Sequence, residues 1–133
     1  MDSECYAAAR GRIEELYALS AAGQWDEVEK RLTDDFVIRE AGSLPFGGIF
    51  EGKDALCRLY GEVFAFWDDP SLEFHDITIS ADHAIALLTL HATSRRTGTR
   101  LAMKLAEVFH LRGDKICGIT PYYFDTAEIA AAG

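Results

Sequence analysis

The first half of the chain holds three segments in which apolar residues recur at steps of three and four positions, the period of a helix that buries one face. Gly23 follows the first segment, and Asp68-Asp69-Pro70 follows the third and is expected to stop it. The predicted helices are Ser3 to about Ala22, a short segment with Trp25, Val28 and Leu32 on one side, and Lys53 to Trp67.

The remaining apolar positions follow the patterns of β-strands. A strand is predicted at Phe36–Ala41, and the glycine-rich stretch after it, Ala41–Gly48, is predicted to be a loop. Short turn signals at Ala81-Asp82, Thr97-Gly98 and Gly113-Asp114 separate four later runs, which we expect to be antiparallel neighbours. These runs are Leu72–Ser80, Ala84–Arg95, Arg100–Arg112 and Lys115–Phe124.

This order, with helices first and most strands afterwards, predicts an α+β fold rather than alternating βαβ units. A length of 133 residues suits one domain, so residues 1–133 are treated as a single unit. The last strands are long, and Gly118 and Pro121 suit bulges or bends, which favours a strongly curved sheet. We therefore expect a cone-shaped, curved antiparallel sheet wrapped around three N-terminal helices, with one apolar pocket inside.

The composition narrows the class of partner. Hydrophobic residues make up 49% of the chain, and 22 acidic against 13 basic residues give a net charge of -9. Such a field repels phosphate backbones and anionic lipids, so we expect neither nucleic acid nor a membrane as partner. The start, Met1-Asp2-Ser3-Glu4, lacks a basic segment followed by an apolar one, and a cytoplasmic location is expected.

The cysteines and histidines form no disulfide or metal pattern. Three widely spaced cysteines are odd in number, and we expect them to be reduced thiols. The four histidines lie in separate predicted strands without HxH or HExxH spacing, so neither a metal site nor a cofactor is expected. These residues are Cys5, Cys57 and Cys117, and His75, His83, His91 and His110.

Three local motifs carry a resemblance to a known family. Pro45–Gly52 is similar to a Pro-x-Gly-Gly-x-aromatic-x-Gly loop, Glu107–Ile116 to a penultimate strand with its Gly-Asp-Lys-Ile turn, and Tyr122–Ala127 to an aromatic-aromatic-Asp-Thr-Ala ending. In this order the chain resembles the SnoaL-like polyketide cyclase branch of the nuclear transport factor two-like and ketosteroid isomerase-like superfamily. The resemblance implies the cystatin-like α+β barrel, a fold that carries both enzymes and proteins without activity.

Glu40 is the first candidate for chemistry. If the strand Phe36–Ala41 alternates, Glu40 shares a face with Phe36 and Ile38, and that face points inward. The segment resembles ketosteroid isomerase through Asp34-Asp35, and the resemblance implies a proton-shuttling carboxylate at Glu40. The alternative is a glutamate at a strand end that leans into solvent.

Glu107 is the second candidate, because it interrupts an apolar face. The residues expected to share that face are Leu101, Met103, Leu105, Glu107, Phe109 and Leu111. A carboxyl among apolar neighbours tends to stay protonated and can then donate a hydrogen bond to a developing oxyanion. The resemblance to the isomerase implies the same acid at Glu107. The alternative is a structural pairing of Glu107 with an Arg or Tyr.

Asp125 is the third candidate. It resembles the aspartate that SnoaL-like cyclases use as acid and base when a polyketide ring closes by an aldol step. The alternative makes Asp125 the N-cap of a short terminal helix over Thr126–Ala132, with Glu128 at the capping-box position. The two roles are compatible.

The predicted pocket lining departs from the isomerase at one position. The place of its oxyanion-hole tyrosine falls on Leu16, and Tyr17 lies about 100° further round the helix, so steroid isomerisation is not the favoured activity. An inward Arg for the Asp-Arg-Asp set of limonene epoxide hydrolase relatives has no clear place either. The candidate substrate-binding residues are Tyr17, Phe46, Phe50, Phe64, Trp67, Met103 and Tyr123.

Together these features predict a cofactor-independent enzyme of the isomerase or cyclase type, acting on an apolar carbonyl or polyketide-like substrate through carboxylate proton transfer. Epoxide hydrolysis is a minor option. A domain that binds an apolar small molecule without chemistry is the main alternative, and a structural dimerisation module with a filled cone is another. The outer sheet face, with His91, Thr93, Ala106 and Val108, is expected to form a homodimer.

Overall fold

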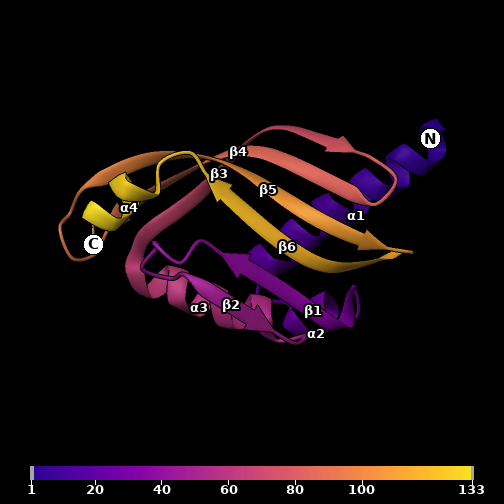
Figure 1. Ribbon diagram of the computed structural model, residues 1–133, viewed down its shortest axis with the longest axis horizontal. Helices are drawn as coiled ribbons and strands as arrows, with labels where there is room; N and C mark the ends of the chain where they lie inside the picture. Colours follow the sequence, from indigo (N-terminus) through magenta and orange to yellow (C-terminus); the bar gives the residue numbers. More distant parts are fainter. Residues whose placement is uncertain (1, 133) are drawn as a thin grey trace.

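The computed structural model describes residues 2–132 and contains one six-stranded sheet that arches over the N-terminal helices (Figure 1). Its elements are α1 (Ser3–Ala21), α2 (Trp25–Glu29), β1 (Leu32–Glu40), β2 (Gly48–Glu51), α3 (Ala55–Phe66), β3 (Trp67–Ile79), β4 (His83–Ser94), β5 (Arg100–Arg112), β6 (Lys115–Tyr123) and α4 (Thr126–Ala132). Within residues 2–132, no helix has both the length and the apolar character that crossing a membrane requires.

The α+β fold is confirmed, and the sheet is curved and unclosed. Its strand order is β2-β1-β6-β5-β4-β3, and β3 to β6 form the expected antiparallel meander. The expectation of a wholly antiparallel sheet is wrong, because β1 pairs with β6 in parallel. This pairing joins strands from opposite ends of the chain, which local turn signals do not encode.

Two element boundaries also differ from the prediction. Gly48–Glu51, expected to begin as part of a loop, pairs with β1 as the strand β2. Asp68-Asp69-Pro70 does not follow directly on α3, because the helix already ends at Phe66 and β3 begins at Trp67. Asp69 has a φ of 51° and lies where the β3–β4 register shifts, between Asp68 and Ser71. The Asp-Asp-Pro segment therefore forms an irregularity within β3.

A bulge in β6 lets β1 approach closely. His110 pairs with Gly118 and Leu111 with Ile116, which leaves Cys117 as the extra residue between them. A Cβ at Gly118 would lie 3.2 Å from the carbonyl oxygen of Val37 on β1. The predicted bulge near Gly118 is therefore present, and the missing side chain makes room for the neighbouring strand.

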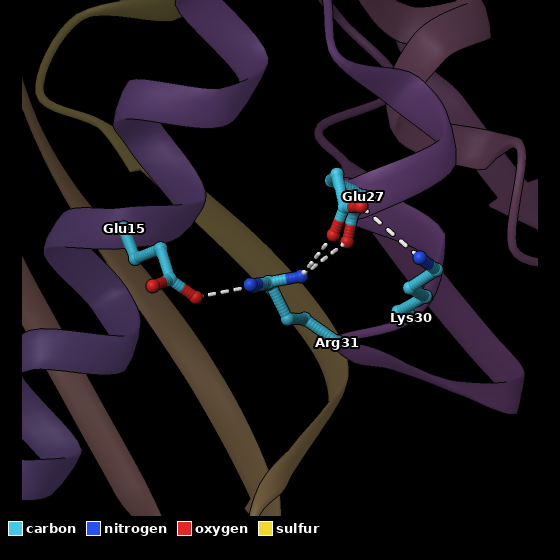
Figure 2. A network of polar contacts seen from close by, with 4 residues as sticks. All are labelled: Glu15, Glu27, Lys30 and Arg31. Carbon is cyan, nitrogen blue, oxygen red and sulfur yellow. Dashed lines mark hydrogen bonds and ion pairs between the residues drawn. The ribbon is translucent and has the colours of Figure 1, made fainter.

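Arg31, between α2 and β1, ties the first two helices together. Its guanidinium contacts the Glu15 carboxylate on α1, and its Nη1 donates to the Glu27 carbonyl oxygen at 2.7 Å and to the Glu27 carboxylate at 3.2 Å (Figure 2). Lys30 adds a contact of 3.0 Å to Glu27. The Arg31 carbonyl accepts from Ile116 of β6, so the network also fixes the start of β1 against the sheet. Each exposed ion pair contributes little alone, roughly 1 kcal/mol or less.

The loop between β1 and β2 is closely packed at one of its glycines, which offers a test of this packing. A Cβ at Gly47 would meet the carbonyl oxygens of Ala41 and Leu44, the latter at 2.9 Å, whereas one at Gly42 would meet nothing within 4 Å. We expect Gly47→Ala to lower the free energy of unfolding by more than about 1 kcal/mol, and Gly42→Ala to change it by less than about 0.5 kcal/mol. Chemical denaturation measures both. Equal losses would contradict the steric account.

Candidate functional site

A cavity of about 750 Å³ lies between the inner face of the sheet and the helices α1 and α3. Six elements besides α1 supply its walls: β1, α3 and all four strands from β3 to β6. Much of the wall is apolar, with Leu56 and Leu59 on α3 and Leu90, Leu105 and Ile119 on the sheet. The size falls in the range of small-molecule sites, roughly 300–1,000 Å³.

Strand alternation brings Glu40 and Glu107 to the same inner face. Ile38 of β1 lies beside Ile119 of β6, and Ile119 lies beside Phe109 of β5. Two positions further along β6, Pro121 pairs with Glu107 of β5. The parallel β1–β6 register, continued by the same two positions, places Glu40 of β1 beside Pro121 on its other side. The two carboxyl-bearing strands are thus separated by one strand, roughly 10 Å in all. Both glutamates line the cavity.

Tyr17 of α1 completes this group, because its hydroxyl donates to Glu107 Oε1 at 2.6 Å. Its ring packs edge-on against Phe74 and Phe109, with centroids 4.7 and 5.5 Å away. Tyr17 therefore lines the cavity, as predicted for a substrate-binding residue, and so does its neighbour Leu16. The structural alternative for Glu107, a pairing with a tyrosine, is also present and is compatible with a chemical role.

Burial sets the protonation of both carboxyls. Glu40 is only 7% exposed, so the alternative of a glutamate leaning into solvent is wrong. Its Oε1 has no hydrogen-bond partner in the part of the chain that the structure describes. Burial, and secondly the charge of Glu107, raise the pKa of Glu40 to about 8. Burial also raises the pKa of Glu107, against an opposing effect of the hydrogen bond from Tyr17. Like charges in one hollow disfavour the doubly ionised state.

The tyrosines of the cavity stay neutral over the physiological range. Burial, followed by the charge of Glu107, raises the pKa of Tyr60 to about 12. Burial, then the charges of Glu40 and Glu107, raise the pKa of Tyr123 well above its ordinary value. Tyr17 is shifted upward by burial and by Glu107 as well, so its pKa lies above the usual range. These hydroxyls therefore act as hydrogen-bond donors rather than as bases.

Arg10, the arginine of the cavity lining, contacts neighbouring groups other than the two carboxyls. Arg10 Nη1 donates to the carbonyl oxygen of Ile77 at 3.2 Å, and the guanidinium lies 3.6 Å from Glu14 and 3.8 Å from Asp76. Neither Glu40 nor Glu107 has a salt bridge among the residues described. Across residues 2–132, no three His, Cys, Asp or Glu side chains converge as metal ligands would.

The predicted substrate-binding residues divide into two groups. Tyr17, Phe64 and Tyr123 line the cavity. The others are buried in the core outside its lining, because they pack against neighbouring side chains; they are Phe46, Phe50, Trp67 and Met103. Sequence reasoning missed Tyr60 and Phe74 as pocket residues. Tyr60 could have been found from its place in the apolar stripe of α3, whereas Phe74 lies in a largely exposed strand that gives no such signal.

Asp125 lies apart from the cavity. Its Oδ1 accepts a hydrogen bond from the Glu128 backbone N–H at 3.1 Å, so the N-cap alternative is confirmed. It is exposed and does not line the cavity that holds Glu40 and Glu107.

Removing this cap should cost stability. We expect Asp125→Ala to lower the free energy of unfolding by about 1 kcal/mol and Asp125→Asn to retain most of it, because Asn caps helices about as well as Asp. Chemical denaturation of the two variants measures the difference. An unchanged Asp125→Ala protein would contradict the capping role.

The pH dependence of stability should report the burial of Glu40. Its ordinary pKa is 4.5 and its folded pKa about 8, so the folded state holds more protons between these values. The contribution of Glu40 to stability is therefore full below about pH 4.5 and is lost as the pH rises through about 8. Gln cannot ionise. The free energy of unfolding of Glu40→Gln should therefore rise relative to that of the wild type as the pH increases between these two values, by about 1.4 kcal/mol per pH unit.

Denaturation at several pH values measures this difference. Glu51→Gln, at an exposed position on β2, is the matched control and should show no such trend. A difference between Glu40→Gln and the wild type that does not change with pH would contradict the burial of an ionisable carboxyl.

Solved structures share this fold at low sequence identity. An NTF2-like protein of unknown function from Burkholderia pseudomallei K96243 has a TM-score of 0.82 at 18% identity, covering 94% of this chain and 96% of that protein. A candidate SnoaL-like polyketide cyclase from Jannaschia sp. CCS1 has a TM-score of 0.83 at 12% identity, covering 99% and 96%. A candidate polyketide cyclase from Xanthomonas campestris pv. campestris has a TM-score of 0.71 at 19% identity, covering 96% and 97%. Comparison with curated proteins gives no match.

The sequence itself carries a family match. The family model described as the SnoaL-like domain matches residues 13–119. This range contains Tyr17, Glu40 and Glu107, and it covers most of the chain. The resemblance drawn from the three motifs is thereby confirmed. The chain belongs to the SnoaL-like domain family and has the NTF2-like fold.

Proposed function

We propose that this protein is a cofactor-independent enzyme that moves a proton at a carbon next to a carbonyl group of an apolar substrate. The observation that carries the proposal is the pair of glutamates in one apolar cavity, Glu40 without a partner and Glu107 hydrogen-bonded to Tyr17. Two carboxyls whose surroundings differ can divide the acid and base roles between them.

Glu107 is the proposed acid. Its Oε1 accepts the hydrogen bond from Tyr17, so in the neutral state its proton belongs on Oε2. The Oε2–H group can then donate to a substrate carbonyl oxygen as negative charge develops there. Tyr17 in this scheme is a positioning residue, because it acts on the substrate through Glu107.

Glu40 is the proposed base. With a pKa of about 8 it is partly ionised near neutral pH and is a stronger base than an ordinary glutamate. It takes the proton from the carbon, and the C–H electron pair forms an enolate whose oxygen is stabilised by Glu107. Return of that proton from Glu40 to another carbon of a conjugated enolate gives isomerisation. Attack of the enolate carbon on a second carbonyl instead forms the ring bond, and the resulting alkoxide takes the proton back from Glu40.

The cavity and the relatives support the substrate class. Apolar side chains form much of the wall, which excludes water from a carbanion-like intermediate. Relatives of the same fold described as candidate polyketide cyclases favour a substrate with several carbonyl groups. The activity of those proteins comes to this chain only as part of the proposal.

An exchange assay tests proton transfer without knowledge of the natural substrate. Apolar aryl ketones such as α-tetralone are incubated with the protein in deuterium oxide, and loss of the α-proton signal is followed by proton NMR. We expect the wild type to accelerate exchange, and Glu40→Gln to reduce the protein-dependent rate by about 100-fold or more, the usual effect of losing a general base. Glu107→Gln should also lower the rate, since Gln is a weaker donor to a forming oxyanion.

Glu51→Gln is the matched control, because it makes the same change at an exposed site outside the cavity. A Glu40→Gln protein that is folded and exchanges as fast as the wild type would overturn the assignment of the base. Ketones that bind without any accelerated exchange would instead favour a binding domain for apolar molecules.

A further inference from the structure

We infer that the ligand of this cavity carries one positive charge, a protonated amine on an apolar body, which the carboxyl pair Glu40 and Glu107 recognises. The inference deepens the proposed function by naming the charge of the substrate. It rests on the proposed function in one respect, which is that both carboxyls contact the same bound molecule.

The titratable groups around the cavity are unevenly distributed. Its interior holds two carboxyls, Glu40 from β1 and Glu107 from β5, and no basic side chain of the described residues pairs with either. The neutral hydroxyls facing them are Tyr17 from α1, Tyr60 from α3 and Tyr123 from β6. The remaining charged or titratable lining residues are Arg10 and Glu14 of α1 and His75 and Asp76 of β3.

The two groups that could supply positive charge already have partners. Arg10 donates to the Ile77 carbonyl and lies between Glu14 and Asp76. The Nε2 atom of His75 is 2.8 Å from the Thr89 hydroxyl. Neither contact leaves a cation directed at the buried carboxyls, so residues 2–132 do not themselves provide the counter-charge of these groups.

Both carboxyls have oxygen atoms that can still accept a hydrogen bond from a ligand. Glu40 is more than nine-tenths buried and lines the cavity, yet its Oε1 has no partner. Tyr17 satisfies only Oε1 of Glu107. A buried carboxylate without a partner is unfavourable, and an ammonium group offers several N–H donors with the matching charge.

The rest of the cavity suits such a ligand. Aromatic rings of Tyr17, Tyr60, Tyr123, Phe64 and Phe74 line it, and they can contact an apolar body and interact with a cation through their faces. The net charge of -9 attracts cations and repels anions over longer range. A ligand with a carboxylate would meet two acids and no free base in the interior.

Three probes of nearly equal shape separate the charge of the ligand from its apolar body. They are phenylpropylamine, phenylpropanol and phenylpropionate, titrated by calorimetry into the full-length protein at about pH 8.5, where Glu40 is largely ionised. We expect the amine to bind about 10- to 100-fold more tightly than the alcohol, as a charge-assisted hydrogen bond predicts, and the acid to bind most weakly. An alcohol that binds as tightly as the amine would overturn the inference.

The wild type also provides a test that needs no variant. At about pH 7, most Glu40 side chains are protonated, so an ammonium ion that stabilises the carboxylate should displace a proton to the buffer. Titrations of the amine in two buffers of different ionisation enthalpy measure this release. We expect a substantial fraction of one proton for the amine and none for the alcohol; no release with the amine would contradict the pairing.

Variants then test whether Glu40 is the residue that gives the preference for the amine over the alcohol. Glu40→Gln should remove most of the amine preference while changing the affinity for the alcohol less than about 3-fold, and Glu51→Gln should change neither. An undiminished preference in Glu40→Gln would place the selectivity elsewhere. These outcomes are separable from the proposed chemistry: ketone exchange can depend on Glu40 while no amine preference exists, and the amine can bind selectively while no ketone exchanges.

Discussion

The structure of the site depends on keeping two carboxyl groups inside an apolar cavity without a basic partner among residues 2–132. A salt bridge inside would have fixed both groups as permanent anions, whereas burial without one leaves their protonation responsive to whatever enters the cavity. The free-energy cost of such burial is clearest at Glu40, because this side chain is 7% exposed and its Oε1 has no hydrogen-bond partner among the described residues. Polar groups left in this state in a folded protein point to a role outside packing.

The fold holds these carboxyls by means far from them in sequence. Parallel pairing of β1 with β6 brings Glu40 next to the strand that neighbours Glu107, and the bulge at Cys117 with the bare Gly118 gives β1 room to approach. Tyr17 reaches Glu107 from α1, ninety positions away in the chain. The Arg31 network in turn joins α1 and α2 to the start of β1. Helix placement and sheet register therefore control the same small group of atoms.

Local patterns predicted most of what local physics determines. The helix of α1, the four long strands, the inward face of Glu107 and the cap at Asp125 all follow from periodicity, turn residues and short-range hydrogen bonds. The parallel β1–β6 pair, the edge strand β2 and the hydrogen bond from Tyr17 to Glu107 were missed because they depend on packing between distant segments. For the same reason the aromatic residues were only partly assigned: Trp67 and Phe46 suit a pocket by type, yet both are enclosed in the core.

Proton transfer and recognition of a cation are different consequences of one electrostatic property of the cavity. Because ionised Glu40 and Glu107 would repel each other, the cavity holds one negative charge more readily than two. With one charge, the ionised carboxyl can take a proton while the neutral one donates a hydrogen bond. A cation near the pair lowers the cost of that charge, so a substrate with an amine beside its carbonyl would increase the fraction of Glu40 able to act as base. Binding energy from the amine would then be used to prepare the base, which links the charge of the substrate to the rate of the reaction.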